Sequence, residues 1–339
     1  MSVLILADEH DPSADRMVLA LNERGAEVNR IDTGWFPAQL NVSARLRGGR
    51  WTGHLTTPAR TIDLEDIHAV WYRSPRPYQF PDSLNSAEEQ HAHMEGKYGL
   101  GGVLMSLPAL WVNHPGRIAG AAYKPYQLAV ASRCGLSVKD TLVTNSADSV
   151  RVFAAEARTV AKMFGAISIV EGGQREFAHT SPLDAADLAD LRGIQVTAHQ
   201  FQHWACKEHE ARMFVVGDEI TTAGIYSHTA SAYIDWRTGY GTNTYRLIDA
   251  PAGVIDAVRR LMAELRLNYG ALDFVIGPDG EWTFLEINAG GQFGWIEDET
   301  GAPITDQLAD MLVKGASSEQ HRGVPRVGRP RAGTRRPAA

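Results

Sequence analysis

The chain has 339 residues, 44% of them hydrophobic and 22% charged, which is the composition of an ordinary globular protein with room for two or three domains. It has no apolar run long enough to span a bilayer, and its N-terminus lacks the basic and apolar regions of a signal peptide, so we expect a cytoplasmic protein with no membrane partner. Two cysteines, Cys134 and Cys206, form neither a disulfide framework nor a paired metal motif.

The net charge of −7 is unevenly distributed along the chain. Residues 316–339 contain six Arg and one Glu, a charge of +5, so the rest of the chain carries about −12. An acidic body of this kind argues against a nucleic-acid partner. The tail at 316–339 is rich in Pro, Gly and Arg, which predicts disorder; it is either a solvated extension or a segment that holds an anionic partner.

The first elements predict a βαβ unit. Residues 3–7 read as a buried strand, Asp11-Pro12 provides a helix cap followed by Pro at the first helical position, and Gly25 ends the helix. Residues 27–31 form the next strand, which we expect to run parallel to the first. No G-x-G-x-x-G follows the first strand, so a dinucleotide site there is unsupported.

Antiparallel strands are predicted over residues 40–57, and residues 67–72 form another buried strand. The latter strand runs into Arg73 and Arg76. Arginines at the exit of a strand can clamp a carboxylate or phosphate with two parallel hydrogen bonds. The alternative is a pair of surface arginines in a loop broken by Pro75.

Two lysines in the next section lie where a ligand could use them. Lys124-Pro125 opens a helix that ends at Gly135, and this puts an ammonium beside a helix N-terminus, where phosphate is favoured. Lys162 lies inside a strand that otherwise reads as buried, so its amine must face solvent, a partner or a ligand. Neither lysine belongs to a P-loop motif. A Gly172-Gly173 loop follows, and residues 181–184 predict the start of a further helix.

Three segments of the second half carry further signals. Residues 200–212 are polar and charged and precede a strand and turn at 213–218; taken alone, they read as a loop between strands. Asp235-Trp236-Arg237 precedes a flexible glycine-containing turn and puts an arginine at its lip. Residues 251–267 carry a continuous apolar stripe and predict a core helix without chemistry.

A hairpin with three oxygen-bearing side chains comes next. Residues 271–276 and 281–287 read as strands around a Gly-Pro-Asp-Gly turn. Asp273 lies on the first strand, while Glu286 and Asn288 share one face of the second, because side chains two apart point the same way. Two carboxylates and an amide oxygen suit Mg²⁺, which leaves its other positions to water and phosphates. The alternative is a hairpin with two solvated acids at its rim.

The pattern D-F at 273–274 followed by F-L-E-x-N at 284–288 resembles the metal-binding signature of the ATP-grasp ligases. Its continuation G-G-Q-F-G-W-I-E at 290–297, with Thr300-Gly301 beyond, is similar to the graspetide synthetases, the microviridin-type maturases of ribosomal peptides. The W-Y-R segment at 71–73 resembles the W-Y-R-R-P of this family, with Ser74 in place of the second Arg.

This resemblance implies an α/β (α+β) ATP-grasp fold. Its parts would be an N-terminal βαβ pre-ATP-grasp domain at 1–115, a central lid subdomain at 116–199, a C-terminal lobe with the metal site at 200–315, and the basic tail at 316–339.

The resemblance also implies roles for individual residues. The residues expected to bind ATP are Lys124 and Lys162 at the phosphates, Gln200, Phe201 and Gln202 at the hinge that meets adenine, and Glu210, where Asp is commoner, at the ribose. The expected catalytic residues are Arg212 at the transferred phosphate and Arg237 toward the acyl phosphate, and the expected Mg²⁺ ligands are Asp273, Glu286 and Asn288.

The implied enzyme is an ATP- and Mg²⁺-dependent macrocyclase. It would convert Asp or Glu side chains of a ribosomal precursor peptide, with its leader and core, to acyl phosphates that Ser or Thr hydroxyls or Lys amines attack, releasing ADP and phosphate. Two alternatives stay open: a ligase that adds a free amino acid to a peptide or protein, like the glutamate ligases, and a nucleotide-binding module without turnover. Whether the chain is a homodimer, and whether its products are esters or amides, is also left open.

Overall fold

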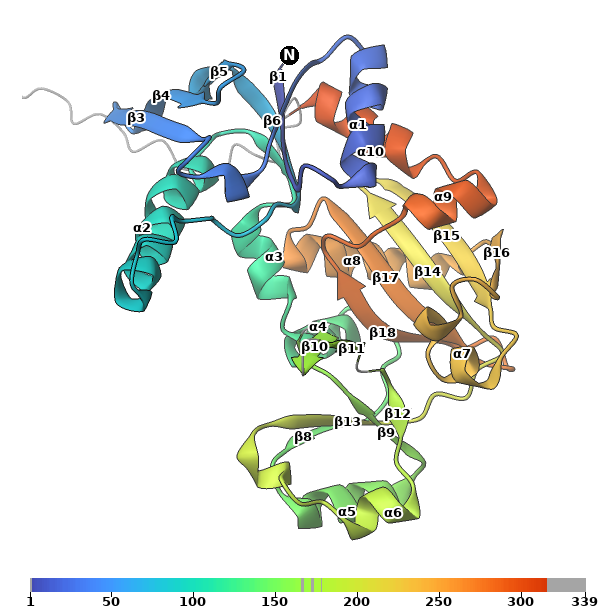
Figure 1. Ribbon diagram of the computed structural model, residues 1–339. Coiled ribbons are helices and arrows are strands. Elements are labelled where there is room, and N and C mark those ends of the chain that lie inside the picture. Colours follow the sequence, from blue (N-terminus) through green and yellow to red (C-terminus); the bar gives the residue numbers. More distant parts are fainter. Residues whose placement is uncertain (1, 166–167, 172–173, 178, 316–339) are drawn as a thin grey trace, which may run out of the picture.

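The computed structural model describes residues 2–165, 168–171, 174–177 and 179–315. The tail at 316–339 and the Gly172-Gly173 loop lie outside the described residues. In Figure 1 the N-terminal sheet, a five-stranded sheet and a smaller sheet follow one another from top to bottom. None of the described helices combines the length and apolarity that a membrane crossing requires.

The predicted βαβ unit is confirmed as the start of a parallel sheet with the strand order β2-β1-β6-β7. All six residues of β1 are buried, and the Asp11 carboxylate caps the following helix by accepting a hydrogen bond from Ala14 N at 3.0 Å. Pro12 at the first helical position fixes where that helix begins. The elements are β1 (Ser2–Ala7), α1 (Pro12–Glu23), β2 (Glu27–Ile31), β6 (Ile67–Ser74) and β7 (Leu110–Val112).

A small antiparallel sheet and a long helix complete this domain. Gly48 and Gly49, both with positive φ, make the tight turn of its first hairpin. Helix α2 begins with a capping box between Asn85 and Glu88. The elements are η1 (Thr33–Trp35), β3 (Asn41–Arg47), β4 (Arg50–Thr56), β5 (Thr61–Asp63), η2 (Leu64–Asp66), α2 (Ser86–Met105) and α3 (Pro115–Ala121).

The next part, which we call the lid, is an antiparallel sheet with the order β12-β9-β13-β8 and two helices on its outer side (Figure 1). The segment 181–184 does not start a helix at Ser181, because Ser181 and Pro182 pair with β9; the helix begins after Asp184, which caps it. The elements are α4 (Lys124–Arg133), β8 (Thr141–Thr144), α5 (Ala147–Glu156), β9 (Thr159–Lys162), β10 (Ser168–Glu171), β11 (Gln174–Phe177), β12 (Ser181–Pro182), α6 (Ala185–Ala189), η3 (Ile194–Val196) and β13 (His199–His203).

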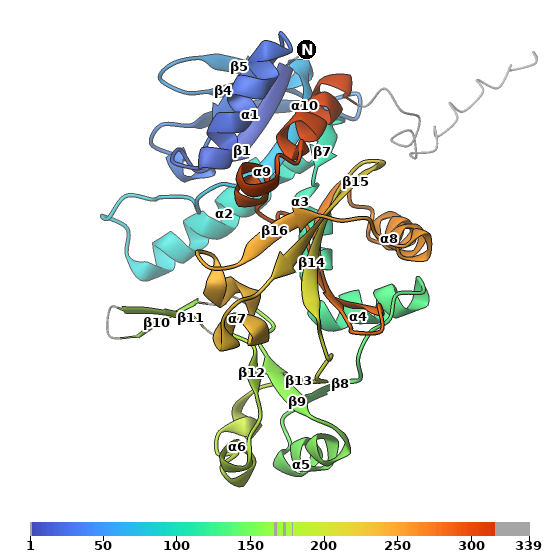
Figure 2. The ribbon, with the colours of Figure 1, turned by 90° about the vertical axis from the view of Figure 1, so that its right-hand side faces the viewer.

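A five-stranded antiparallel sheet, β16-β15-β14-β17-β18, forms the last lobe. Figure 2 shows α4 and α8 on one side of this sheet and α7 on the other. The elements are β14 (His209–Val216), β15 (Glu219–Tyr226), α7 (Ala230–Ile234), η4 (Trp236–Gly239), β16 (Thr244–Leu247), α8 (Ala252–Leu265), β17 (Tyr269–Ile276), β18 (Trp282–Asn288), α9 (Gly294–Thr300) and α10 (Ile304–Lys314).

The apolar stripe predicted for residues 251–267 packs α8 onto this sheet. Val258 and Leu261 are fully buried there against β14, β17 and β18. Each fully buried aliphatic side chain of this size contributes about 1.5–3 kcal/mol to folding. The sheet that carries the candidate site is therefore held rigid from behind.

The chain ends by returning to its beginning. Helix α10 lies against α1, and Arg24 of the α1 C-cap forms ion pairs with Asp306 and Asp310 at 2.9 and 2.6 Å (Figure 1). Apolar residues of the parallel sheet, of α10 and of the five-stranded sheet share one continuous core. The N-terminal domain and the last lobe therefore pack as a unit, and the lid extends from it.

Candidate active site

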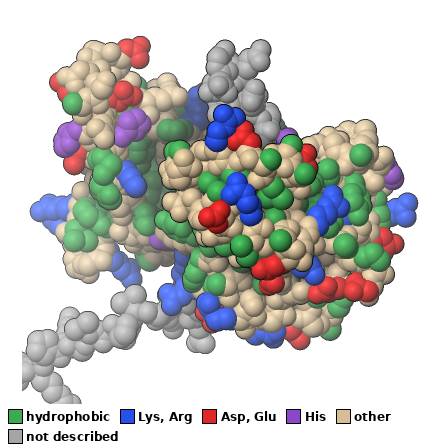
Figure 3. All heavy atoms as spheres, turned by 90° about the horizontal axis from the view of Figure 1, so that it is seen from below, with side chains coloured by type: hydrophobic (Ala, Val, Ile, Leu, Met, Phe, Trp, Pro, Cys, Tyr) green, Lys and Arg blue, Asp and Glu red, His purple; other side chains and the backbone are tan. Residues whose placement is uncertain are grey.

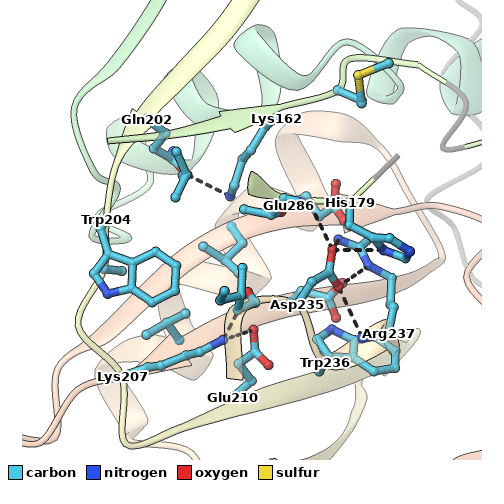
Figure 4. A pocket seen from close by; sticks show the side chains of 18 of the residues that line it. Lys162, His179, Gln202, Trp204, Lys207, Glu210, Asp235, Trp236, Arg237 and Glu286 are labelled. Carbon is cyan, nitrogen blue, oxygen red and sulfur yellow. Dashed lines mark hydrogen bonds and ion pairs between the residues drawn. The ribbon is translucent and has the colours of Figure 1, made fainter. Parts of the chain in front are cut away.

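A cavity lies between the lid and the five-stranded sheet. It brings together side chains from segments that are far apart in the sequence, and Figure 4 shows several of them pointing into it from both sides. Of the residues singled out in the sequence, those that line the cavity are Lys124, Lys162, Gln202, Glu210, Arg237, Asp273 and Glu286.

The predicted hairpin holds the two carboxylates opposite each other. β17 and β18 pair with a bulge between Asp273 and Phe274, so that Asp273 faces Glu286 directly whereas Phe274 faces Phe284. A bulge of this kind places an extra residue on one strand and re-aims the side chains that follow. Both carboxylates consequently lie at the same point of the sheet.

Glu286 is held by two cations. Its carboxylate lies 3.0 Å from Lys124 Nζ and 3.3 Å from Arg237 Nη1. Burial opposes ionisation of Glu286, but the charges of Lys124 and Arg237 outweigh it and lower the pKa of this carboxyl to about 2. Glu286 is therefore ionised at neutral pH and available as a ligand.

Asp273 is held by Arg212. A single Arg212 nitrogen, Nη1, donates to both carboxylate oxygens, at 2.8 and 3.0 Å. The Arg212 guanidinium also lies over the rings of Trp236 and Phe214, at 5.4 and 5.7 Å from their centroids. Burial and the facing Glu286 raise the pKa of Asp273, and the charge of Arg212 opposes this. Asp273 lines the cavity, and Arg212 is not among the lining residues.

Asn288 lies at the exposed end of β18, and it too is not among the lining residues. Its side-chain oxygen accepts a hydrogen bond from Gly290 N at 3.0 Å, which fixes the orientation of the amide. An amide oxygen has two lone pairs, so one acceptor position is left for a ligand.

The loop after Asn288 is fixed by three buried donors, which we call the carbonyl clamp. Asn113 Nδ2 donates to Ala289 O at 2.7 Å, and Arg73 Nη1 donates to Gly290 O at 3.1 Å. Tyr269 Oη donates to Gly291 O at 2.6 Å. Three consecutive carbonyls are thus held by side chains from β6, β17 and the end of β7, and this loop follows directly on the predicted ligands.

Arg73 and Arg76 therefore do not form an anion clamp at a strand exit. Arg73 is buried, and besides Gly290 it contacts the Asp11 carboxylate at 3.4 Å. Arg76 is paired with the buried Asp32 and with Glu9, at 2.6 and 2.8 Å. Both guanidinium groups serve the packing of the N-terminal domain.

The donor set fits Mg²⁺ under one condition. Within the described ranges, no group of three His, Cys, Asp or Glu side chains could hold a metal ion. The oxygens of Asp273, Glu286 and Asn288 are hard donors that Mg²⁺ accepts, and it commonly takes its other positions from water and substrate phosphates. The residues therefore fit Mg²⁺ that binds together with phosphates rather than alone.

Lys162 lies on the lid side of the cavity. It donates a hydrogen bond to Gln202 Oε1 at 2.8 Å, and Gln202 Nε2 in turn donates to Thr141 Oγ1 at 2.9 Å. Burial, partly offset by the charge of Glu286, lowers the pKa of Lys162 to about 8. This amine is a cation that the empty fold accommodates poorly, as expected for a group that meets an anion.

The other two hinge residues lie elsewhere. The Phe201 ring packs in the apolar core of the lid with Val150 and Ile194, so only its backbone could reach a base. Gln200 is buried beside Lys162 in the sheet, and its side-chain oxygen has no hydrogen-bond partner among the described residues. Neither side chain lines the cavity.

Sequence reasoning missed Lys207. Its Nζ lies 2.9 Å from Glu210 Oε1 and over the rings of Trp204 and Tyr233, at 5.6 and 5.2 Å. Burial raises the pKa of Glu210 to about 7, against the charge of Lys207. The signal in the sequence was the spacing of three residues between a lysine and an acid next to Trp204, in a segment that reads as a loop.

The D-W-R segment owes its shape to Asp235, whose role was also missed. The buried Asp235 carboxylate accepts hydrogen bonds from Arg237 Nε at 2.8 Å and from Thr180 N at 3.2 Å. It lies 3.7 Å from His179 Nδ1. Burial opposes the charge on Arg237, but Asp235 and Glu286 raise its pKa further above its ordinary value. Arg237 is therefore a permanent cation aimed at the carboxylates.

A second cavity of about 630 Å³ lies beside α2, and Figure 3 shows the hollow with hydrophobic side chains on its walls. Its walls include Tyr72, Tyr78, Met94 and Trp111. None of the predicted ATP-binding, metal-binding or catalytic residues lines it.

Comparisons with known proteins agree on one family. Residues 2–119 match the MvdD pre-ATP-grasp domain, and residues 122–312 match an ATP-grasp domain, the third family of its clade. A search of curated proteins gives no match.

Solved structures match over nearly the whole chain. The macrocyclase MdnC bound with precursor peptide MdnA, from Microcystis aeruginosa MRC, is 30% identical with a TM-score of 0.82, over 93% of this chain and 100% of that one. A Chryseobacterium gregarium ATP-grasp ligase associated with ribosomally synthesised peptides, in complex with ADP and a leader and core peptide, is 27% identical with a TM-score of 0.86, over 92% and 96%. The ATP-grasp ligase PsnB complexed with minimal precursor, Mg and ADP is 25% identical with a TM-score of 0.74, over 92% and 96%.

Proposed function

The chain belongs to the ATP-grasp ligases, and on that premise we propose that it is a macrocyclase of a ribosomally made precursor peptide. It activates Asp or Glu side chains of the peptide with ATP and joins them to Ser or Thr hydroxyls or to Lys amines of the same peptide. The relatives in complex with precursor, leader and core peptides support a peptide substrate. The parts of the chain act as a pre-ATP-grasp domain at 1–115, a lid at 116–199 and a catalytic lobe at 200–315.

One observation carries the chemistry: a single cavity joins three cations to two carboxylates. Lys124, Lys162 and Arg237 converge from α4, β9 and η4 on the side of the sheet where Asp273 faces Glu286. Phosphoryl transfer to a carboxylate brings several negative charges together, and its catalysis rests on neutralising and aligning them. This cavity provides the groups for that task.

ATP lies across the cavity in this proposal, with its base toward the lid hinge and its phosphates toward the hairpin. Gln200, Gln202 and the backbone of Phe201 face the base, and Glu210 faces the ribose. Lys124 and Lys162 hold the phosphates. Asp273, Glu286 and Asn288 hold Mg²⁺, which when bound neutralises phosphate charge as the phosphoryl group moves.

The first step transfers the terminal phosphoryl group of ATP to a peptide carboxylate. A carboxylate oxygen attacks the γ-phosphorus, the bond to the β-phosphate oxygen breaks, and ADP leaves. Arg212 stabilises the transferring group through Asp273, and Arg237 approaches the acyl phosphate directly. In the second step a hydroxyl or amine attacks the acyl carbon and inorganic phosphate leaves.

The product of the reaction provides the test. Each link removes one water, so the precursor loses about 18 Da per ring while ADP and phosphate form in equal amounts. The enzyme is incubated with Mg-ATP and the Thr-, Asp- and Glu-rich precursor encoded beside it, followed by mass spectrometry. A mass gain equal to one amino acid would instead select a ligase for free amino acids. An unchanged precursor together with firm ATP binding would select a module without turnover.

A further inference from the structure

We propose that His179 is the general base of the second step, the group that takes the proton from the hydroxyl or amine as it attacks the acyl phosphate. This assignment rests on the proposed function. A hydroxyl is a poor nucleophile until it loses its proton, so its attack gains from a base placed within reach.

His179 lies in the wall of the cavity. It follows the β10–β11 hairpin, two residues before β12, and its ring is about a third exposed. Figure 4 shows the ring beside the Arg237 guanidinium and Asp235, on the side of the cavity where Glu286 also projects. A base at this place borders the region to which Arg237 brings its charge.

Asp235 orients the imidazole. Its buried carboxylate is fixed by Arg237 and by Thr180 N, and it lies 3.7 Å from His179 Nδ1. A contact of this length shortens readily once a substrate fills the site. An Nδ1–H directed at a fixed carboxylate leaves Nε2 as the basic nitrogen, which is the arrangement of a histidine base with its orienting acid.

The other groups of the cavity are already engaged. The carboxylates of Asp273, Glu286 and Glu210 are paired with Arg212, with Lys124 and Arg237, and with Lys207. A second histidine, His203, is stacked on Phe153 and contacts the Phe153 carbonyl at 3.3 Å. Within the described part of the chain, the His179 ring makes no hydrogen bond, which leaves its Nε2 available.

Atoms and electrons balance in this step. The acceptor oxygen or nitrogen forms a bond to the acyl carbon, and its proton passes to His179 Nε2. The bond between the acyl carbon and the phosphate oxygen breaks, and the electron pair leaves with inorganic phosphate. The imidazolium then returns its proton to solvent, so no further reactant is consumed.

The experiment separates the two steps. His179→Gln and His179→Ala are compared with wild type in ADP formation, in cross-linking of the precursor, and in trapping of the acyl phosphate by hydroxylamine, which attacks without a base. We expect ADP formation and trapping to persist, while cross-linking slows about 100-fold or more. Added imidazole should restore part of the cross-linking in His179→Ala. His228→Gln, which removes an exposed histidine outside the cavity, is the matched control and should behave as wild type.

The pH profile gives an independent readout. Wild-type cross-linking should fall as acid protonates His179, and this limb should be missing from His179→Gln. The other ionisable and charged groups of the cavity are present in both proteins and cancel in the comparison: Lys124 of α4, Lys162 of β9, His203 of β13, Lys207, Glu210 of β14, Asp235, Arg237 of η4, Asp273 of β17 and Glu286 of β18.

The outcomes distinguish this inference from the proposed function. Wild type that forms neither hydroxamate nor cross-links with Mg-ATP and the precursor contradicts the function itself. Wild type that forms cross-links, with His179→Gln and His179→Ala equally fast, overturns only the base. A variant that has also lost trapping and ADP formation would place His179 in the first step, and this too overturns the assignment.

Discussion

Replacement of Lys162 by Met should make the protein more stable and at the same time unable to hold ATP. Burial lowers the pKa of this amine from 10.5 to about 8. A difference of one pKa unit corresponds to 1.36 kcal/mol, so the charged amine costs the folded state about 3 kcal/mol at pH 7. The substitution also removes the hydrogen bond to Gln202, which is worth about 1–2 kcal/mol. The net gain in stability is about 1–2 kcal/mol.

The dependence of this gain on pH has a defined direction. The folded state binds the Lys162 proton less tightly than the unfolded chain does, so the cost is fully present below pH 8 and disappears as the pH rises toward 10.5. Lys162→Met should therefore exceed wild type in denaturant stability at pH 7, and the difference should shrink when the pH is raised to about 9.5.

The assay is denaturant unfolding at several pH values, together with the thermal shift caused by Mg-ATP. Lys139→Met removes a lysine whose partner Glu281 lies at the surface, and this control should change stability by about 1 kcal/mol or less and keep the thermal shift. The reasoning is refuted if Lys162→Met is less stable than wild type at pH 7, or if it keeps the full thermal shift with Mg-ATP.

Three further outcomes test the hairpin and its surroundings. Glu286→Gln should keep the circular dichroism of wild type but slow ADP release about 100-fold, and ADP release at the wild-type rate would speak against Glu286 as a ligand. Mn²⁺ followed by electron paramagnetic resonance should bind weakly to the protein alone and tightly with an ATP analogue, because Lys124, Arg212 and Arg237 neutralise the carboxylates when phosphates are absent; equal affinities would refute this. Arg73→Met should lower stability by about 1–3 kcal/mol and reduce ATP turnover, while Arg73→Lys should recover part of both; unchanged turnover in Arg73→Met would show that the clamp has no role in catalysis.

The parts of the fold that could be predicted are those set by nearby residues. The βαβ start, the hairpin at residues 40–57, helix α8 and the β17–β18 hairpin follow from periodicity, caps and turn residues, and the structure confirms them. The polar segment at 200–212 is the counter-example. It contains two strands, because its backbone pairs with β8, β9 and β17, partners that lie far away in the sequence.

The site was predictable where one residue conflicts with its own surroundings. A lysine in a buried strand marked Lys162, and acids on an apolar hairpin marked Asp273 and Glu286. The bulge that makes these two acids face each other has no sequence signature, since it is set by the pairing of β17 with β18. Lys207 and His179 were missed for a related reason: each gains its meaning only from a partner that tertiary structure brings close.

The carbonyl clamp has a consequence for protein engineering. Its acceptors are the backbone carbonyls of residues 289–291, which any sequence provides, whereas its donors are the side chains of Arg73, Asn113 and Tyr269. Two of these donors lie in the N-terminal domain. In hybrids that exchange this domain between relatives, the loop can differ freely in sequence provided that its backbone path is kept, but the incoming domain must carry the arginine and the asparagine. Compatibility of the two halves is therefore decided by two positions and not by overall similarity.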